Sequence, residues 1–211
     1  MQLIINNNIY TFSDEELNYR YIDEGEEATI YYYNNKALKI YKDYCRGIRL
    51  SEKDAIYLQK INTERFLLPI DIIYDINNNF IGYTTKFIKG YSKENIKILQ
   101  LEFLKRELLI LKKDIEELSK YNISIYDIEN YNFILGDGIY LIDPGSYRIE
   151  DNNTLDYNIR YLRSFIINEI LLLSRRLTIR ERELINKNFN FEDLLNSEEK
   201  TISLYSKKLA K

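Results

Sequence analysis

Two aspartates and an asparagine lie close together near the middle of the sequence, with a predicted β-hairpin between them. Asp127 precedes Asn132 by five positions, and Phe133 to Ile142 forms two apolar runs around the turn Gly136-Asp137-Gly138. Two such runs separated by a glycine-containing turn predict an antiparallel hairpin. A turn centred near Asp137 places Asn132 roughly opposite Asp143 at the open end. One amide oxygen and two carboxylates then converge, a set suited to Mg²⁺ beside phosphate and water.

The composition excludes several other kinds of chemistry. The chain of 211 residues has no histidine and a single cysteine, Cys45, which rules out His-based triads, His-ligated metals and internal disulfides. Acid–base chemistry must therefore come from carboxylates, lysines or tyrosines. The net charge of −3 gives no basic field for nucleic acid, and the apolar runs are too short to span a membrane. The N-terminal residues lack the pattern of a signal peptide, so we expect a cytoplasmic protein.

The elements that position these residues change character along the chain. Residues 1–88 predict short β-strands around one helix. Tyr31–Tyr41 and Ile72–Tyr83 each predict a hairpin, and Asn34-Asn35 in the first of them tolerates the left-handed geometry of a tight turn. Leu50–Ile61 has apolar residues at helical spacing, so we expect the helix there.

Residues 89–211 predict a mainly helical region. Ile98–Tyr121 carries a stripe of leucine and isoleucine at helical spacing, which predicts a long amphipathic helix. Further helices are predicted near Leu155–Leu173 and Ile179–Ile185. The expected fold class is therefore α+β, with a β-rich first part and a reduced, mainly helical second part.

The arrangement of Asp127, Asn132 and Asp143 resembles the active site of protein kinases. The spacing Asp-x-x-x-x-Asn, the hairpin and Asp143-Pro144-Gly145 are similar to the kinase catalytic loop and its Asp-Phe-Gly motif. The resemblance implies a two-lobed protein-kinase-like fold that binds ATP and Mg²⁺. It implies that Asn132 and Asp143 hold the metal and that Asp127 orients or deprotonates the acceptor hydroxyl. The four residues from Asp143 to Ser146 are also typical of a plain type II turn.

A second part of the resemblance lies within residues 1–88. Ala37-Leu38-Lys39 is similar to the kinase strand whose lysine binds phosphates, and Gly25 to Ile30 resembles the end of the glycine-rich loop, with Ala28 in place of its last glycine. Hairpin pairing places Ile30 opposite Lys39, on the face that also carries Ala37. The resemblance implies further contacts: Glu52 or Asp54 as the acidic partner of Lys39, the backbone of Lys86 and Ile88 at the adenine edge beside the linker Lys89-Gly90, and Ile134 as the pocket floor.

Several positions depart from the kinase pattern. Ile125-Tyr126 replaces the His-Arg that precedes the catalytic aspartate, and Glu129 stands where Ser/Thr kinases place a lysine. The glycine-rich loop keeps one glycine, and no Ala-Pro-Glu motif follows Asp143. Asp156 resembles the residue that anchors the catalytic loop to the next helix.

We therefore expect an ATP- and Mg²⁺-dependent phosphotransferase, with protein Ser/Thr as the favoured acceptor. The alternatives are a small-molecule kinase and a pseudokinase that binds nucleotide or a protein partner without transferring phosphate. The sequence identifies neither the acceptor nor the pathway nor the oligomeric state.

Overall fold

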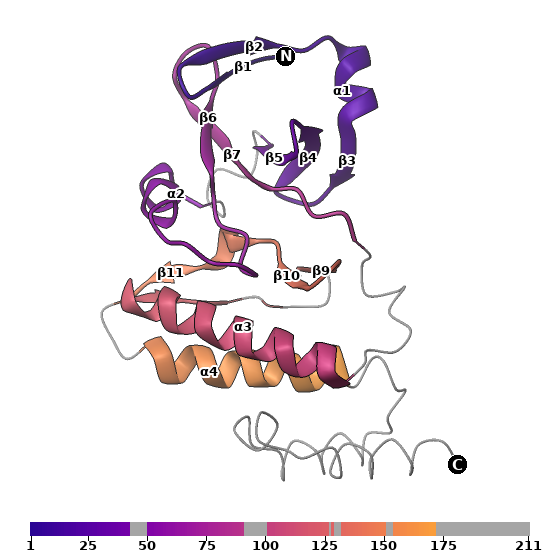
Figure 1. Ribbon diagram of the computed structural model, residues 1–211. Helices are drawn as coiled ribbons and strands as arrows, with labels where there is room; N and C mark the ends of the chain where they lie inside the picture. The colour runs from indigo at the N-terminus through magenta and orange to yellow at the C-terminus, as the bar shows by residue number, and fades with distance from the viewer. Residues whose placement is uncertain (43–49, 91–100, 127, 129–131, 151–153, 172–211) are drawn as a thin grey trace.

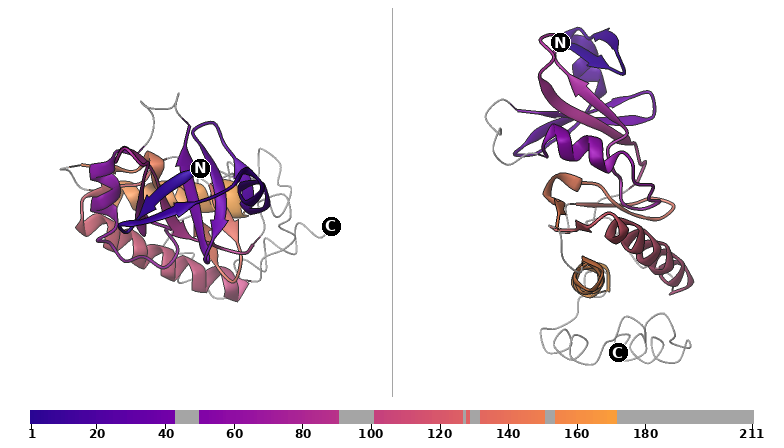
Figure 2. Two further views of the ribbon diagram at one scale, coloured as in Figure 1. Left: turned by 90° about the horizontal axis from the view of Figure 1, so that it is seen from above. Right: turned by 90° about the vertical axis from the view of Figure 1, so that its left-hand side faces the viewer.

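The computed structural model has the α+β architecture expected from the sequence (Figure 1). It describes residues 1–42, 50–90, 101–126, 128, 132–150 and 154–171. A curled, seven-stranded antiparallel sheet lies at one end of the molecule, and two long helices lie toward the other (Figure 2). The strands follow the spatial order β2 (Asn8–Thr11), β1 (Gln2–Ile5), β6 (Asp71–Tyr74), β7 (Phe80–Lys86), β5 (Lys36–Tyr41), β4 (Ala28–Tyr33) and β3 (Tyr21–Glu24).

Both predicted hairpins of the sheet are confirmed. Asn34 and Asn35 have positive φ angles of 48° and 61°, the conformation that a two-residue hairpin turn requires and that asparagine tolerates. This turn joins β4 to β5 and pairs Ile30 with Lys39, as predicted. Lys39 also pairs with Tyr83 of β7, so its strand lies in the interior of the sheet.

The prediction of one helix in residues 1–88 is wrong, because the structure holds two there. The unexpected helix is α1 (Asp14–Arg20), which begins with a capping box between Ser13 and Glu16. The Ser13 hydroxyl accepts from the Glu16 N–H, and the Glu16 carboxylate accepts from the Ser13 N–H. The predicted helix is α2 (Glu52–Leu58), whose first turn is capped by Ser51.

The described residues of the second part form two α-helices and two small β-ribbons. The helix α3 (Leu101–Lys120) buries Leu108, Leu111, Ile115 and Leu118, which belong to the predicted apolar stripe. It lies beside α4 (Thr154–Phe165), which continues as a π-helix, η4 (Ile166–Leu171). The remaining elements are β8 (Ile123–Ser124), β9 (Phe133–Leu135), β10 (Ile139–Leu141), the 3₁₀-helix η3 (Pro144–Ser146) and β11 (Arg148–Ile149). The helix predicted near Ile179–Ile185 lies outside the described residues.

A connecting segment, defined here as Thr63–Leu67, joins the sheet to the helical part. Phe66 forms a parallel bridge with Leu141 of β10, and two backbone hydrogen bonds of 2.8 Å flank this bridge, from the Leu67 N–H to Leu141 and from the Leu141 N–H to Arg65. One hydrophobic cluster runs from Tyr83 of the sheet through Phe66 to α3 and α4. The two parts therefore share a core. No described helix is both long and apolar enough to cross a bilayer.

Candidate active site

Two carboxylates hold the ammonium group of Lys39, which projects from the interior strand β5. Its Nζ lies 2.7 and 2.8 Å from the two carboxylate oxygens of Asp143 and 3.6 Å from Glu27 Oε2. The lysine side chain is only 11 % exposed. Burial alone would lower the pKa of Lys39, but the adjacent Asp143 carboxylate outweighs it, and the pKa is raised above its ordinary value. Lys39 is therefore a fixed cation facing Asp143.

Asp143 ends the β9–β10 hairpin, which forms as predicted. Its Oδ1 also accepts from the Gly145 N–H at 3.0 Å, so Asp143 caps the 3₁₀-helix that follows. The expectation of a type II turn here is wrong, because such a turn needs a glycine with positive φ and none of the described glycines has one. The carboxylate thus faces Lys39 from a short helical turn.

Asn132 lies at the open end of the same hairpin. Ile142, one residue before Asp143, donates its N–H to the Asn132 carbonyl at 3.0 Å. The register is therefore shifted by one residue from the predicted pairing of Asn132 with Asp143. Both side chains nevertheless line the same cavity. Asp127, the predicted base, and Glu129 lie outside the described residues.

These residues surround a charged cavity of about 580 Å³, and an apolar slot of about 160 Å³ adjoins it. The charged cavity is lined by Asp23, Gly25, Glu26, Glu27, Ala28, Ile30, Lys39, Asn132, Ile142 and Asp143. The apolar slot shares Ile30 and Lys39 with it and is lined further by Ala37, Lys86, Ile88 and Ile134, among others. The structure therefore brings together ten predicted site residues around two connected spaces.

The segment after β7 closes one side of the apolar slot. The Phe87 N–H donates to the Asn35 carbonyl at 3.1 Å, which continues the sheet's pairing past Lys86. A Cβ atom at Gly90 would lie 2.3 Å from the Leu135 carbonyl oxygen. Only glycine allows this close approach between the predicted linker and the β9–β10 hairpin.

The two acids of α2 considered as partners of Lys39 lie elsewhere. Glu52 accepts from the Tyr74 hydroxyl at 2.8 Å, and Asp54 accepts from the Ser51 hydroxyl at 2.7 Å at the start of the helix. Among the described residues, the ion pairs of Lys39 are those with Asp143 and Glu27. Neither Glu52 nor Asp54 therefore pairs with Lys39 in this structure, because α2 directs both toward other hydroxyl groups.

Two buried tyrosines that the sequence did not single out flank Lys39. The centres of the Tyr41 and Tyr83 rings each lie 5.9 Å from Nζ, within range of a cation–π interaction. Burial raises the pKa of both hydroxyls well above their ordinary value, so both remain neutral. Tyr41 is two residues after Lys39 on β5, and this alternate spacing is the signal that could have found it.

Asn158 of α4, which the sequence did not single out, ties this helix to the chain that leads to Asp127. Its Oδ1 accepts from the Ile125 N–H at 2.9 Å, and its Nδ2 donates to the Ile123 carbonyl at 2.7 Å. Asn158 is fully buried, whereas Asp156 is exposed. The prediction for Asp156 stays a prediction, because most of the loop that it would anchor lies outside the described residues, whereas the buried face of α4 points Asn158 toward the chain that leads to Asp127.

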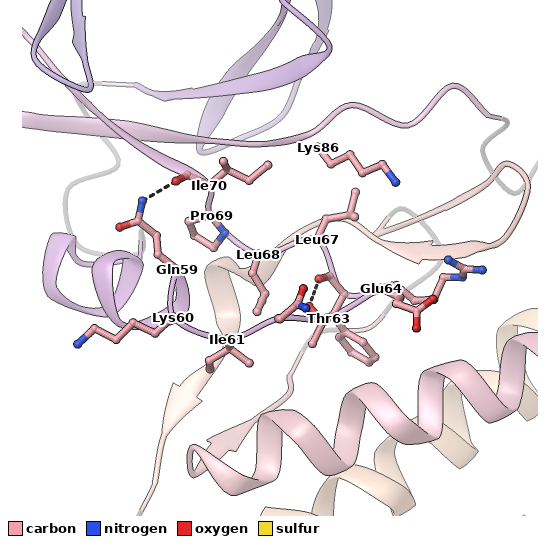
Figure 3. Close-up of a pocket in the computed structure, with 13 residues that line it drawn as sticks. Gln59, Lys60, Ile61, Thr63, Glu64, Leu67, Leu68, Pro69, Ile70 and Lys86 are labelled. Atoms are coloured by element: carbon pink, nitrogen blue, oxygen red, sulfur yellow. Dashed lines mark hydrogen bonds between the residues drawn. The ribbon is translucent and has the colours of Figure 1, made fainter.

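A rear groove of about 540 Å³ follows residues 59–70 (Figure 3). Two of its polar side chains bond to backbone carbonyls within it: Gln59 donates to Ile70 at 2.7 Å and Thr63 donates to Phe66 at 2.6 Å. Leu67 and Lys86 line both this groove and the apolar slot. The groove holds none of the other predicted site residues, so it is separate from the charged cavity.

The donor set suits a metal that arrives with phosphate. Within the described ranges, no group of three or more His, Cys, Asp or Glu side chains could hold an ion by itself. Asp143 and Asn132 offer one carboxylate and one amide oxygen, and Mg²⁺ commonly completes such a set with phosphate and water oxygens. Searches for similar proteins found no matching family model and no matching curated protein.

Proposed function

We propose that this chain is a cytoplasmic, ATP- and Mg²⁺-dependent phosphotransferase with the two-lobed arrangement of protein kinases. One observation carries the proposal. Lys39 from the sheet and the Asn132–Asp143 pair from the hairpin line one cavity, and that cavity opens into an apolar slot. A nucleoside triphosphate has the matching polarity, with a flat apolar base at one end and charged phosphates at the other.

Each part of the site then has a distinct task. Ile30 of the sheet and Ile134 of the β9–β10 hairpin both line the slot, where they would enclose the base. Lys39 would bind the phosphates, while Asn132 and Asp143 would hold the metal. Bound Mg²⁺·ATP supplies the transferable phosphoryl group, and Asp127 would take the proton of the attacking hydroxyl. Protein Ser/Thr is the proposed acceptor.

The present arrangement requires an exchange of partners when ligand binds. Both oxygens of Asp143 contact Lys39, so a metal would compete with the lysine for this carboxylate and favour its turning to another anion. Phosphate provides that anion. Metal and nucleotide should therefore bind together. The phosphates would neutralise Lys39 when the metal takes Asp143, and the metal would neutralise Asp143 when Lys39 turns to the phosphates.

A specific feature favours a second candidate, which is nucleotide binding without phosphotransfer. Among the described residues, Asp23, Glu26, Glu27 and Asp143 line the charged cavity together with one cation, Lys39. Four carboxylates would repel a triphosphate unless cations accompany it. Turnover, and not binding, separates this candidate from the enzyme.

The test combines ligand-induced stabilisation with ATP turnover. Mg²⁺·ATP should raise the melting temperature of the wild type, and Asp143→Ala should remove that increase. Asp127→Asn should retain binding and lose turnover, either as ATP hydrolysis or as autophosphorylation. A wild type that neither binds nor turns over ATP would contradict the proposal, and binding with no turnover would establish the second candidate.

A further inference from the structure

Lys39 cannot rely on Asp143 alone if Asp143 binds a metal. The ammonium is nearly buried, beside the rings of Tyr41 and Tyr83. A buried cation that loses its counterion is costly, and a metal at Asp143 would withdraw the two short contacts that Lys39 now has. A protein anion that stays beside the lysine would keep it directed at the cavity until the phosphates reach it.

Glu27 is placed to be that anion. Its Oε2 lies 3.6 Å from Lys39 Nζ, and its side chain is 28 % exposed. A Cβ atom built on Gly145 would lie 3.6 Å from both of these atoms and 3.0 Å from Asp143 Oδ1. The Glu27 carboxylate, from the turn before β4, and the Asp143 carboxylate, from the end of the hairpin, thus both contact Lys39 close to Gly145.

The backbone around Glu27 is fixed independently of α2. The Lys42 N–H donates to the Glu27 carbonyl at 2.9 Å, and the Gly25 N–H donates to the Ala28 carbonyl at 3.0 Å. These bonds hold the turn into β4 against β5, the strand that carries Lys39. Glu27 and Lys39 therefore belong to one hairpin and keep their separation however α2 is oriented.

We infer that Glu27 is the permanent partner of Lys39 and acts as a positioning residue for phosphate binding, in the place considered for Glu52 or Asp54. This inference rests on the proposed function. When Mg²⁺ takes Asp143, Lys39 keeps the Glu27 contact and turns its remaining N–H donors to the phosphates. The orientation of the lysine then does not depend on the position of α2.

The test compares Glu27→Gln with Glu27→Asp and with Glu52→Gln as the matched control on α2. Each protein is titrated with Mg²⁺·ATP and, separately, with adenosine, which lacks the phosphates that Lys39 would contact. Glu27→Gln should weaken Mg²⁺·ATP binding about tenfold, the effect of one charge-assisted contact, and leave adenosine binding unchanged. Glu27→Asp should recover most of the loss, and Glu52→Gln should match the wild type.

The outcomes separate this inference from the proposed function. A wild type that binds neither ligand overturns both. A wild type that binds both ligands, with Mg²⁺·ATP affinity unchanged in Glu27→Gln, overturns the inference alone. An equal loss of adenosine and ATP affinity in Glu27→Gln would assign Glu27 a purely structural role and would also overturn it. The inference is also overturned if Glu52→Gln shows the tenfold loss and Glu27→Gln does not.

Discussion

The protein contains two ion pairs of similar length that are built in opposite ways. In one, Glu107 of α3 is fully buried, and its two oxygens accept from Arg65 at 2.6 and 3.2 Å, from Arg106 at 3.1 Å and from the Ile139 N–H at 3.0 Å. In the other, Asp143 is 33 % exposed and borders the charged cavity. The first pair has every acceptor position occupied, whereas the second opens onto a space where another ligand can replace Lys39.

This difference separates a saturated, structural pair from one whose partners would exchange under the proposed function. Glu107 ties α3 to the connecting segment through Arg65 and to the β9–β10 hairpin through Ile139, so it fixes the parts that carry the site. The Lys39–Asp143 pair joins the sheet to the end of that hairpin at a point where partners can exchange. Saturated hydrogen bonding makes a pair rigid, and an incomplete set allows a charge to change its partner.

Breaking the saturated pair should have the largest effect on stability. Glu107→Gln leaves the Arg65 guanidinium without its carboxylate, so we expect a loss of about 3 kcal/mol in the free energy of unfolding. Urea denaturation followed by circular dichroism measures this loss. Glu117→Gln is the matched control, because Glu117 lies on the same helix in an exposed pair with Lys120. Equal midpoints for the two variants would contradict the distinction.

Asn158 extends the comparison to an uncharged, buried side chain whose amide oxygen and nitrogen are both hydrogen-bonded. Asn158→Ala leaves the buried Ile125 N–H without an acceptor, so we expect a loss of about 2 kcal/mol in unfolding free energy. Arg160→Gln, two residues later on the exposed side of α4, serves as the control and should unfold like the wild type. If the two variants are equally stable, Asn158 does not anchor this segment.

The two ion pairs should lose their contributions to the free energy of unfolding at opposite ends of the pH scale. Burial would raise the pKa of Glu107, but hydrogen bonds from Arg65 and Ile139 lower it below the ordinary 4.5. The stability that Glu107 contributes is therefore full above pH 4.5 and is lost as pH falls through its lowered pKa. The raised pKa of Lys39 has the opposite sign, so its contribution is present below 10.5 and is lost as pH rises through the folded value.

Unfolding free energies across pH test both signs. Glu107→Gln should flatten the acid limb of the curve and leave the alkaline limb unchanged. Lys39→Met should change the alkaline limb only. An acid limb that keeps its full slope in Glu107→Gln would show that other carboxylates carry the acid sensitivity.

The smallest effect on stability is expected at the exchangeable pair. Asp143→Asn leaves Lys39 in contact with Glu27, and the Asp143 side chain is a third exposed. We therefore expect a loss below about 2 kcal/mol in unfolding free energy, less than for Glu107→Gln, because Glu27 stays beside the nearly buried lysine. A loss as large as that of Glu107→Gln would place this pair among the structural ones.

Local signals in the sequence predicted the local parts of the fold. Asn34-Asn35 predicted both the turn and the register that brings Ile30 opposite Lys39. The same signal at Asn6-Asn7, whose φ angles are also positive, marks the β1–β2 hairpin that was not predicted. The capping box from Ser13 to Glu16 likewise marks α1. Both elements were accessible to the same reasoning, since turns and caps depend on neighbouring residues.

Long-range contacts were not accessible in the same way. Periodicity does not state which strands become neighbours, so the bridge between Phe66 and Leu141 had no sequence signal. The approach of Glu27 to Lys39 depends on side-chain direction across a hairpin as well as on register. The contacts of Asn158 with Ile123 and Ile125 depend on how α4 rotates against its neighbours. These contacts depend on how elements pack in three dimensions, which the spacing of residues in the sequence does not specify.

The central claim is that Lys39 and Asp143 form an exchangeable pair that a nucleotide and a metal divide between them. Calorimetric titration of the wild type with Mg²⁺ alone, ADP alone and Mg²⁺·ADP tests it most directly, with Asp143→Asn and Lys39→Met titrated in parallel. We predict that Mg²⁺ alone gives no measurable binding and that Mg²⁺·ADP binds more tightly than ADP. Asp143→Asn should abolish that difference, and Lys39→Met should weaken both ADP forms. Mg²⁺·ADP affinity that is unchanged in both variants would contradict the account.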